Sequence, residues 1–202
     1  MGFAKQGMAE RLALLLAGRV PRMDAPDNSR PAGVLVPLYV RDDAWHVLLN
    51  VRSHHVGQHK GEIAFPGGRL EPDDADMVTC ALREAHEEMG IRPGDVQVLG
   101  QLDGVYTRTG YMVWPIVGVI PYPYSFVADR REVAEVIEAP LGALLDASAV
   151  RHETRLQPDG TLLRRRAFAH GRHLIFGATA VMLDQLLGYV SQAMDASLEA
   201  EG

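Results

Sequence analysis

The segment spanning residues 73–90 constrains the fold most, because its apolar side chains fall on one stripe of a helix. These side chains recur at spacings of three and four residues: Met77, Val78, Ala81, Leu82, Ala85 and Met89. Asp73 or Asp74 can cap the start of such a helix, and Gly90 is a natural stop. The pattern therefore predicts an amphipathic helix that packs on one side against a core.

The rest of the chain intersperses strands with helices. Strands are expected at 34–40 and 45–51 (one hairpin), 96–102, 112–120, 150–156 and 162–169 (a second hairpin), and 174–176. Helices are expected at 4–18, 129–137 and 178–196, with a short turn after Pro140 and a Pro- and Asp-rich linker at 21–31. Because the strands and helices do not alternate regularly, we expect an α/β layered fold with a mixed sheet.

Charge and cysteine content narrow the class of protein. The formal net charge of the 202-residue chain is −6, which argues against a nucleic-acid binder that relies on bulk positive charge. No run approaches the roughly 20 apolar residues that span a bilayer, so we expect no membrane partner. Cys80 is the single cysteine and cannot form an internal disulfide, which favours a reducing compartment. We therefore expect a cytoplasmic protein.

Three glutamates on the predicted helix are the strongest candidates for chemistry. Glu84, Glu87 and Glu88 lie within about one turn of each other, on an arc opposed to the apolar stripe. Their mutual repulsion favours a neutralising cation, and carboxylate oxygens suit Mg²⁺ or Mn²⁺. Arg83 is spaced to pair with Glu87 at i+4. A solvated helix face is the alternative interpretation.

The stretch from residue 68 to residue 91 resembles the Nudix box, G-x5-E-x7-R-E-U-x-E-E-x-G-U, in which U is a bulky aliphatic residue. The second half, residues 83–91, matches with Ala85 at the first aliphatic position. The first half has one extra residue and lacks the first glutamate, for which Asp74 is the nearest substitute. This resemblance implies a Nudix-type α/β/α sandwich with a mixed β-sheet. We expect a helix and linker over 1–31, packed on the domain, and a Nudix hydrolase domain over 32–202.

The preceding stretch, from residue 48 to residue 68, is similar to the signature of the coenzyme A pyrophosphatase branch of this family, L-L-T-x-R-S-x3-R-x3-G-x3-F-P-G-G. Asn50 replaces the threonine and Gly57 replaces the second arginine. The similarity implies hydrolysis of the pyrophosphate bond of coenzyme A or its thioesters, giving 3′,5′-ADP and 4′-phosphopantetheine or its acyl derivative. A small nucleotide would then be the partner. Candidate substrate-binding residues on this stretch are Arg52, Ser53, Gly67 and Gly68.

The family resemblance also implies roles for the acidic residues. Glu84 and Glu88 are the first candidates as ligands of Mg²⁺ or Mn²⁺, followed by Glu87, which could instead orient the attacking water. Arg83 would hold a carboxylate in place. Glu132 resembles a loop acid that acts as a base or an extra ligand; a plain surface glutamate on the predicted 129–137 helix is the competing interpretation, and the sequence favours it slightly.

Other interpretations remain open at this point. The same fold could act on ADP-ribose or NADH, or could be a nucleotide-binding module without catalysis. His54, His55 and His59 suggest polar loop or substrate contacts more than a zinc site. Within Arg164-Arg165-Arg166 the outer two share one face of a strand and could meet a 3′-phosphate or solvent. The N-terminal helix could also pack on a second subunit in a homodimer.

Overall fold

The computed structural model describes residues 3–53, 61–157 and 159–200, with side chains described from Gly7 to Asp195. The histidines at 54, 55 and 59, which were considered for zinc or substrate contacts, lie outside the described residues. No described helix is long and apolar enough to cross a membrane.

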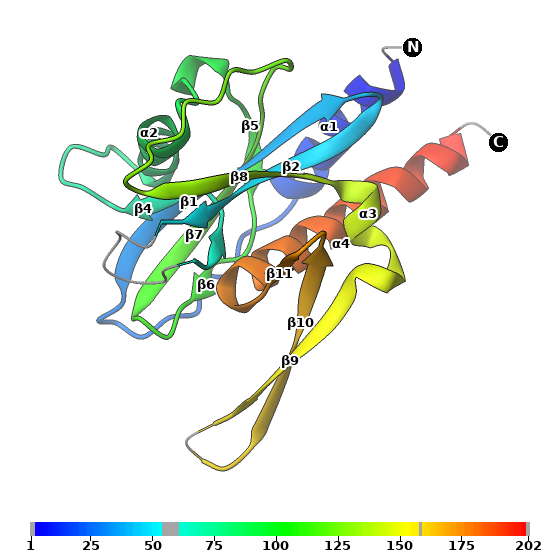
Figure 1. Ribbon diagram of the computed structural model, residues 1–202. Coiled ribbons are helices and arrows are strands. Elements are labelled where there is room, and N and C mark those ends of the chain that lie inside the picture. Colours follow the sequence, from blue (N-terminus) through cyan, green and yellow to red (C-terminus); the bar gives the residue numbers. More distant parts are fainter. Residues whose placement is uncertain (1–2, 54–60, 158, 201–202) are drawn as a thin grey trace.

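A mixed sheet forms the centre of the molecule (Figure 1). Its strands are β1 (Arg30–Arg41), β2 (Ala44–Arg52), β3 (Ile63–Ala64), β4 (Gly67–Arg69), β5 (Gln97–Gln101), β6 (Val105–Tyr106), β7 (Tyr111–Val119) and β8 (Val133–Pro140). The main path runs β3-β2-β1-β7-β5, while β4, β6 and β8 pair with β1, β7 and β2 respectively. β1 and β7 are parallel and the other pairs are antiparallel, so the prediction of a mixed sheet is confirmed.

Helices cover both faces of this sheet. Along β1, Val36 and Leu38 contribute to the core beneath α1 (Phe3–Ala17) and α4 (Gly177–Ala200). The alternate residues Leu35 and Tyr39 contribute to the core beneath α2 (Met77–Met89). This period of two puts apolar side chains on both faces of one strand, as a sheet between two helical layers requires. The predicted α/β/α sandwich is therefore confirmed.

A second, three-stranded sheet extends from this body. It contains β9 (Val150–Leu156), β10 (Leu162–His170) and β11 (His173–Ile175), all antiparallel. β9 and β10 form the predicted second hairpin, which projects away from the central sheet in Figure 1. α3 (Leu141–Leu145) and the short 3₁₀ turn Ala147–Ala149 connect β8 to this hairpin. Another 3₁₀ turn, Pro93–Asp95, follows α2.

One predicted helix is wrong. Residues 129–137 do not form a helix, because β8 pairs with β2 along its length, with Leu49 opposite Ile137. The apolar spacing of Val133 and Ile137 fits a helix and a strand equally well in so short a run, and pairing with β2 decides it. Residues 129–132 form a turn, in which the Glu132 N–H donates to the Asp129 carbonyl at 2.9 Å.

The start of α2 also differs from expectation. The cap is Asp76, whose carboxylate accepts a hydrogen bond from the Thr79 N–H at 2.7 Å, rather than Asp73 or Asp74. Gly90 ends the helix in the left-handed conformation, with φ of 72°. Asp74 therefore does not cap α2, and its carboxylate can contact other residues of the site.

Candidate functional site

Glycines let three backbone segments approach one another at the site. A side chain at Gly33 of β1 would lie 2.8 Å from the Met77 carbonyl, so only glycine allows α2 to pack this closely. β4 pairs with the same part of β1, with Gly68 opposite Gly33. As a result the Glu84 carboxylate of α2 packs directly on Gly68, and any side chain there would collide with it.

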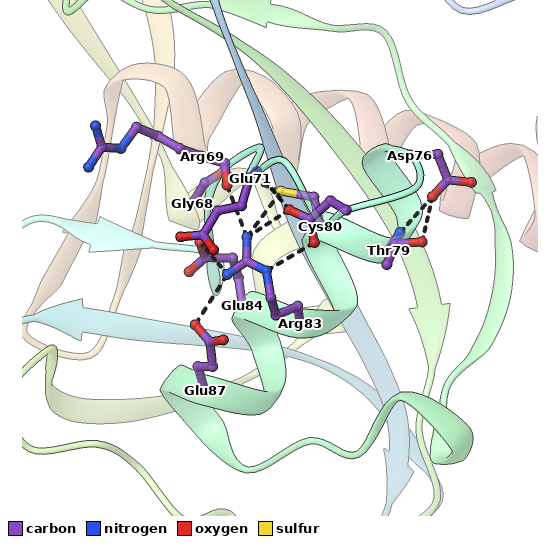
Figure 2. Close-up of polar contacts among 10 residues, drawn as sticks. Gly68, Arg69, Glu71, Asp76, Thr79, Cys80, Arg83, Glu84 and Glu87 are labelled. Carbon is purple, nitrogen blue, oxygen red and sulfur yellow. Dashed lines mark hydrogen bonds and ion pairs between the residues drawn. The ribbon is translucent and has the colours of Figure 1, made fainter.

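Arg83 is the centre of the acidic cluster (Figure 2). Its Nε donates to Asp74 Oδ1 at 3.0 Å and its Nη2 donates to Asp74 Oδ2 at 2.9 Å. Its Nη1 bridges two carboxylates, with 3.0 Å to Glu84 Oε1 and 3.2 Å to Glu87 Oε2. The predicted i+4 pair of Arg83 and Glu87 is therefore present, within a larger network.

Glu88 occupies a different environment from its two neighbours. It is 2% exposed, so it does not lie on a solvated arc opposed to the apolar stripe. Asn50 of β2 donates from Nδ2 to Glu88 Oε2 at 3.0 Å, and the Gly67 N–H approaches the same oxygen at 3.4 Å. Arg52 Nη1 lies 3.7 Å from Glu88 Oε1. Glu88 thus faces the sheet, while Glu87 is exposed.

Burial sets the proton affinities of the cluster. It raises the pKa of the buried Glu88 to about 7 and also raises the pKa of the half-buried Glu84, because loss of surrounding water disfavours the charged carboxylate. The hydrogen bonds from Arg83 lower the pKa of Asp74 to about 2, and the same contact raises the pKa of Arg83. Burial also raises the pKa of the Cys80 thiol to about 11, which argues against a catalytic thiolate.

These residues fit a hard divalent cation, although the described side chains are not arranged as a three-ligand site. Two desolvated carboxylates, Glu84 and Glu88, gain most from a nearby positive charge. The buried Asn50 Oδ1 has no hydrogen-bond partner among the described residues. The Arg83 guanidinium now neutralises Glu84 and Glu87. A cation there would have to take those oxygens from Arg83.

A cavity of about 890 Å³ opens over this cluster. Its lining includes seven of the sequence-predicted candidates: Arg52, Gly67, Gly68, Glu84, Glu87, Glu88 and Glu132. Ser53 is not among the described lining residues; it is buried, and its N–H donates to the Glu132 carbonyl at 2.7 Å. Arg83 is not among the described lining residues either, but its guanidinium forms ion pairs with two carboxylates that are, Glu84 and Glu87.

Several site residues were missed from the sequence. Asn50 counted only as a departure from a signature, although it contacts Glu88. Arg155 and Arg165 line the cavity from the β9–β10 hairpin. The outer arginines of the triplet are not in that lining, and Arg166 pairs with Asp184 at 2.9 Å. Only the pairing register of β9 with β10, which the sequence does not give, places Arg165 on the face of Arg155.

Comparison with known proteins identifies the family to which this chain belongs. The sequence profile described as the NUDIX domain matches residues 29–146. The chain belongs to the Nudix hydrolase family. It is 39% identical over 159 residues to a protein of Enterobacter sp. (strain 638) described as uncharacterized Nudix hydrolase NudL, covering 79% of this chain and 82% of that protein. A NudL protein of Photorhabdus laumondii is likewise 39% identical over 160 residues, covering 79% and 84%.

Solved structures agree at the level of the fold. A MutT/nudix family protein from Enterococcus faecalis superposes with a TM-score of 0.53 at 17% identity, over 91% of this chain and 69% of that chain. The family profile includes Arg83, Glu84, Glu87 and Glu88, so the acidic cluster lies within the part of the chain that carries the family resemblance.

Proposed function

We propose that this Nudix hydrolase is a cytoplasmic, divalent-cation-dependent pyrophosphatase that cleaves the pyrophosphate bond of coenzyme A or its thioesters. The observation that carries the proposal is the position of a buried carboxylate, Glu88, and a half-buried one, Glu84, in the wall of a nucleotide-sized cavity beside Gly67 and Gly68. The similarity of residues 48–68 to the coenzyme A signature supports the choice of substrate.

Glu84 and Glu88, with Glu87, would hold Mg²⁺ or Mn²⁺. When bound, the cation would offset the negative charge of the diphosphate and polarise its oxygens. Arg52 lines the same wall, with a planar guanidinium suited to a phosphate oxygen. Gly67 and Gly68 also line the cavity, and because neither has a side chain, β1 and the Glu84 carboxylate pack directly against this backbone.

The reaction also needs a base. A water oxygen attacks one phosphorus in line, the bond from that phosphorus to the bridging oxygen breaks, and the second phosphate leaves with the electron pair. The proton of the water passes to a carboxylate of the cavity wall. Glu132 lines the cavity from the turn before β8, and Glu87 lines it from α2, so we assign this role to one of these two residues.

A substrate panel tests the proposal. The purified chain is incubated with coenzyme A, ADP-ribose or NADH, with and without Mg²⁺, and the phosphomonoesters released are separated from intact substrate by chromatography and quantified. Metal-dependent release that is fastest from coenzyme A is the expected result. Faster release from ADP-ribose or NADH would replace the substrate assignment, and no release from any of them would favour a binding module.

A further inference from the structure

The inner face of the β9–β10 hairpin is a wall of the same cavity that contains the acidic cluster. Five of its residues line that cavity: Glu153, Arg155, Gln157, Leu163 and Arg165. In the strand register, Arg165 lies opposite Glu153 and Leu163 lies opposite Arg155. Side chains opposite each other in an antiparallel pair lie on the same face. The hairpin thus presents two arginines to the space above α2.

The two arginines differ in how far they are already engaged. Arg155 uses Nε to contact Glu153 Oε1, and no described residue accepts a hydrogen bond from its terminal nitrogens. Arg165 is exposed, and in the described part of the chain no carboxylate lies within ion-pair distance of it. Its guanidinium is therefore available to a ligand.

Both carboxylate oxygens of Glu153 already have partners. One oxygen contacts Arg155, and the other accepts a hydrogen bond from the Gly177 N–H, at the start of α4, at 3.3 Å. Two guanidinium groups and one carboxylate leave a net positive charge of one unit on this wall. The helix N-terminus adds to the positive potential there.

The cavity lining carries charges of both signs. The carboxylates of α2 suit a cation and a diphosphate, whereas the hairpin contributes two arginines, Arg155 and Arg165, to the lining. A ligand that uses the α2 carboxylates and the hairpin arginines together needs a second anionic group besides the diphosphate. A phosphate ester fits best, because its oxygens match the fork of an arginine side chain.

We propose that Arg165, assisted by Arg155, binds a phosphomonoester on the nucleotide part of the substrate, separate from the diphosphate that is cleaved. The inference rests on the proposed function and specifies its substrate class, a nucleotide with a phosphate on its ribose. It moves the assignment within the arginine triplet from the outer two residues to the middle one.

Equilibrium binding of two nucleotides tests the proposal without relying on turnover. The dissociation constants of 3′,5′-ADP and 5′-AMP are measured by calorimetry for the full chain and for Arg165→Gln. We expect the wild type to bind 3′,5′-ADP at least about tenfold more tightly, and Arg165→Gln to lose most of this preference. Arg164→Gln is the matched control, because it removes the same charge from the preceding residue, which is not among the described residues that line the cavity.

The outcomes separate this inference from the proposed function. Equal affinities for the two nucleotides in the wild type, or an unchanged preference in Arg165→Gln, would overturn the subsite. The same pair of variants is then assayed for hydrolysis of coenzyme A and of dephospho-coenzyme A. A chain that cleaves both at the same rate has the pyrophosphatase activity without the subsite. A chain that prefers 3′,5′-ADP but cleaves neither has the subsite without the activity.

Discussion

Asp74 holds Arg83 through two parallel hydrogen bonds, from Nε to Oδ1 at 3.0 Å and from Nη2 to Oδ2 at 2.9 Å. The Asp74 side chain is only 2% exposed. Bidentate contacts of this kind fix the orientation of a guanidinium. The Arg83 Nη1 then meets Glu84 and Glu87, so an acid outside the helix positions the carboxylates on it.

Replacing Asp74 by Asn should therefore destabilise the fold. We expect the free energy of unfolding at pH 7 to fall by about 1–3 kcal/mol, the range for hydrogen bonds that involve charged groups. Urea unfolding measures the loss. Asp73→Asn is the control, because Asp73 is exposed and has the same charge. A loss as large in the control would contradict the role of Asp74.

The same variant has a characteristic pH dependence. The hydrogen bonds from Arg83 lower the pKa of Asp74 to about 2 in the folded chain, below the ordinary aspartate value of 3.8. Its stabilising effect is therefore full well above pH 3.8 and is lost as the pH falls towards 2. The difference between wild type and Asp74→Asn should shrink by about half between pH 7 and pH 3. A difference that stays constant over this range would show that the charge of Asp74 is not the cause.

Glu88→Gln and Glu84→Gln should reduce turnover without preventing folding. We expect turnover to fall by about 10²–10³ or more, as for loss of a group that stabilises developing charge. In metal-free buffer at pH 8 the unfolding free energy should stay the same or rise for Glu88→Gln, because burial opposes the charge on Glu88. Turnover is measured with saturating Mg²⁺ and stability by urea unfolding. Turnover close to wild type in either variant would refute these roles.

Much of the fold was predictable because it follows from local patterns. The stripe through Ala81 and Ala85 predicts α2, and Gly90 predicts its end. The β1–β2 hairpin follows from two apolar runs around a polar turn. Residues 129–137 were assigned wrongly because β8 forms through pairing with β2, a contact distant in sequence.

The site was predictable only in its local part. The spacing of Glu84 and Glu88 indicates a shared helical surface, but it does not reveal that Glu88 is buried against Asn50. That contact joins residues 38 positions apart. Arg165 is still further along the chain, and only the strand register shows that it faces the cavity with Arg155. Long-range contacts of this kind leave no periodic trace in a single sequence.

Binding of a cation should stabilise the wild type more than the glutamine variants. A ligand at 100 times its dissociation constant raises the unfolding free energy by about 2.7 kcal/mol when it binds only the folded state. We expect Mn²⁺ to give a gain of this kind in the wild type and much less in Glu84→Gln or Glu88→Gln. Thermal unfolding with and without Mn²⁺ measures it independently of activity. An equal gain in all three chains would place the cation elsewhere.

Gly68→Ala should disturb the site while leaving most of the fold intact. A methyl group at this position would collide with the Glu84 carboxylate, which must then move. Because the carboxylate is at the end of a flexible side chain, it can move aside, and we expect only a small loss of stability. We also expect Mn²⁺ affinity to fall at least about tenfold, roughly the effect of disturbing the residues that orient a metal ligand. Gly188→Ala is the matched control: Gly188 lies in α4, and apart from the adjoining backbone of this helix no described atom lies within 4 Å of the added methyl group. That change should stabilise the helix by about 0.5–1 kcal/mol and leave Mn²⁺ binding unaltered. Unchanged Mn²⁺ affinity in Gly68→Ala, measured by calorimetry, would show that the position of Glu84 on Gly68 is not required for holding the ion.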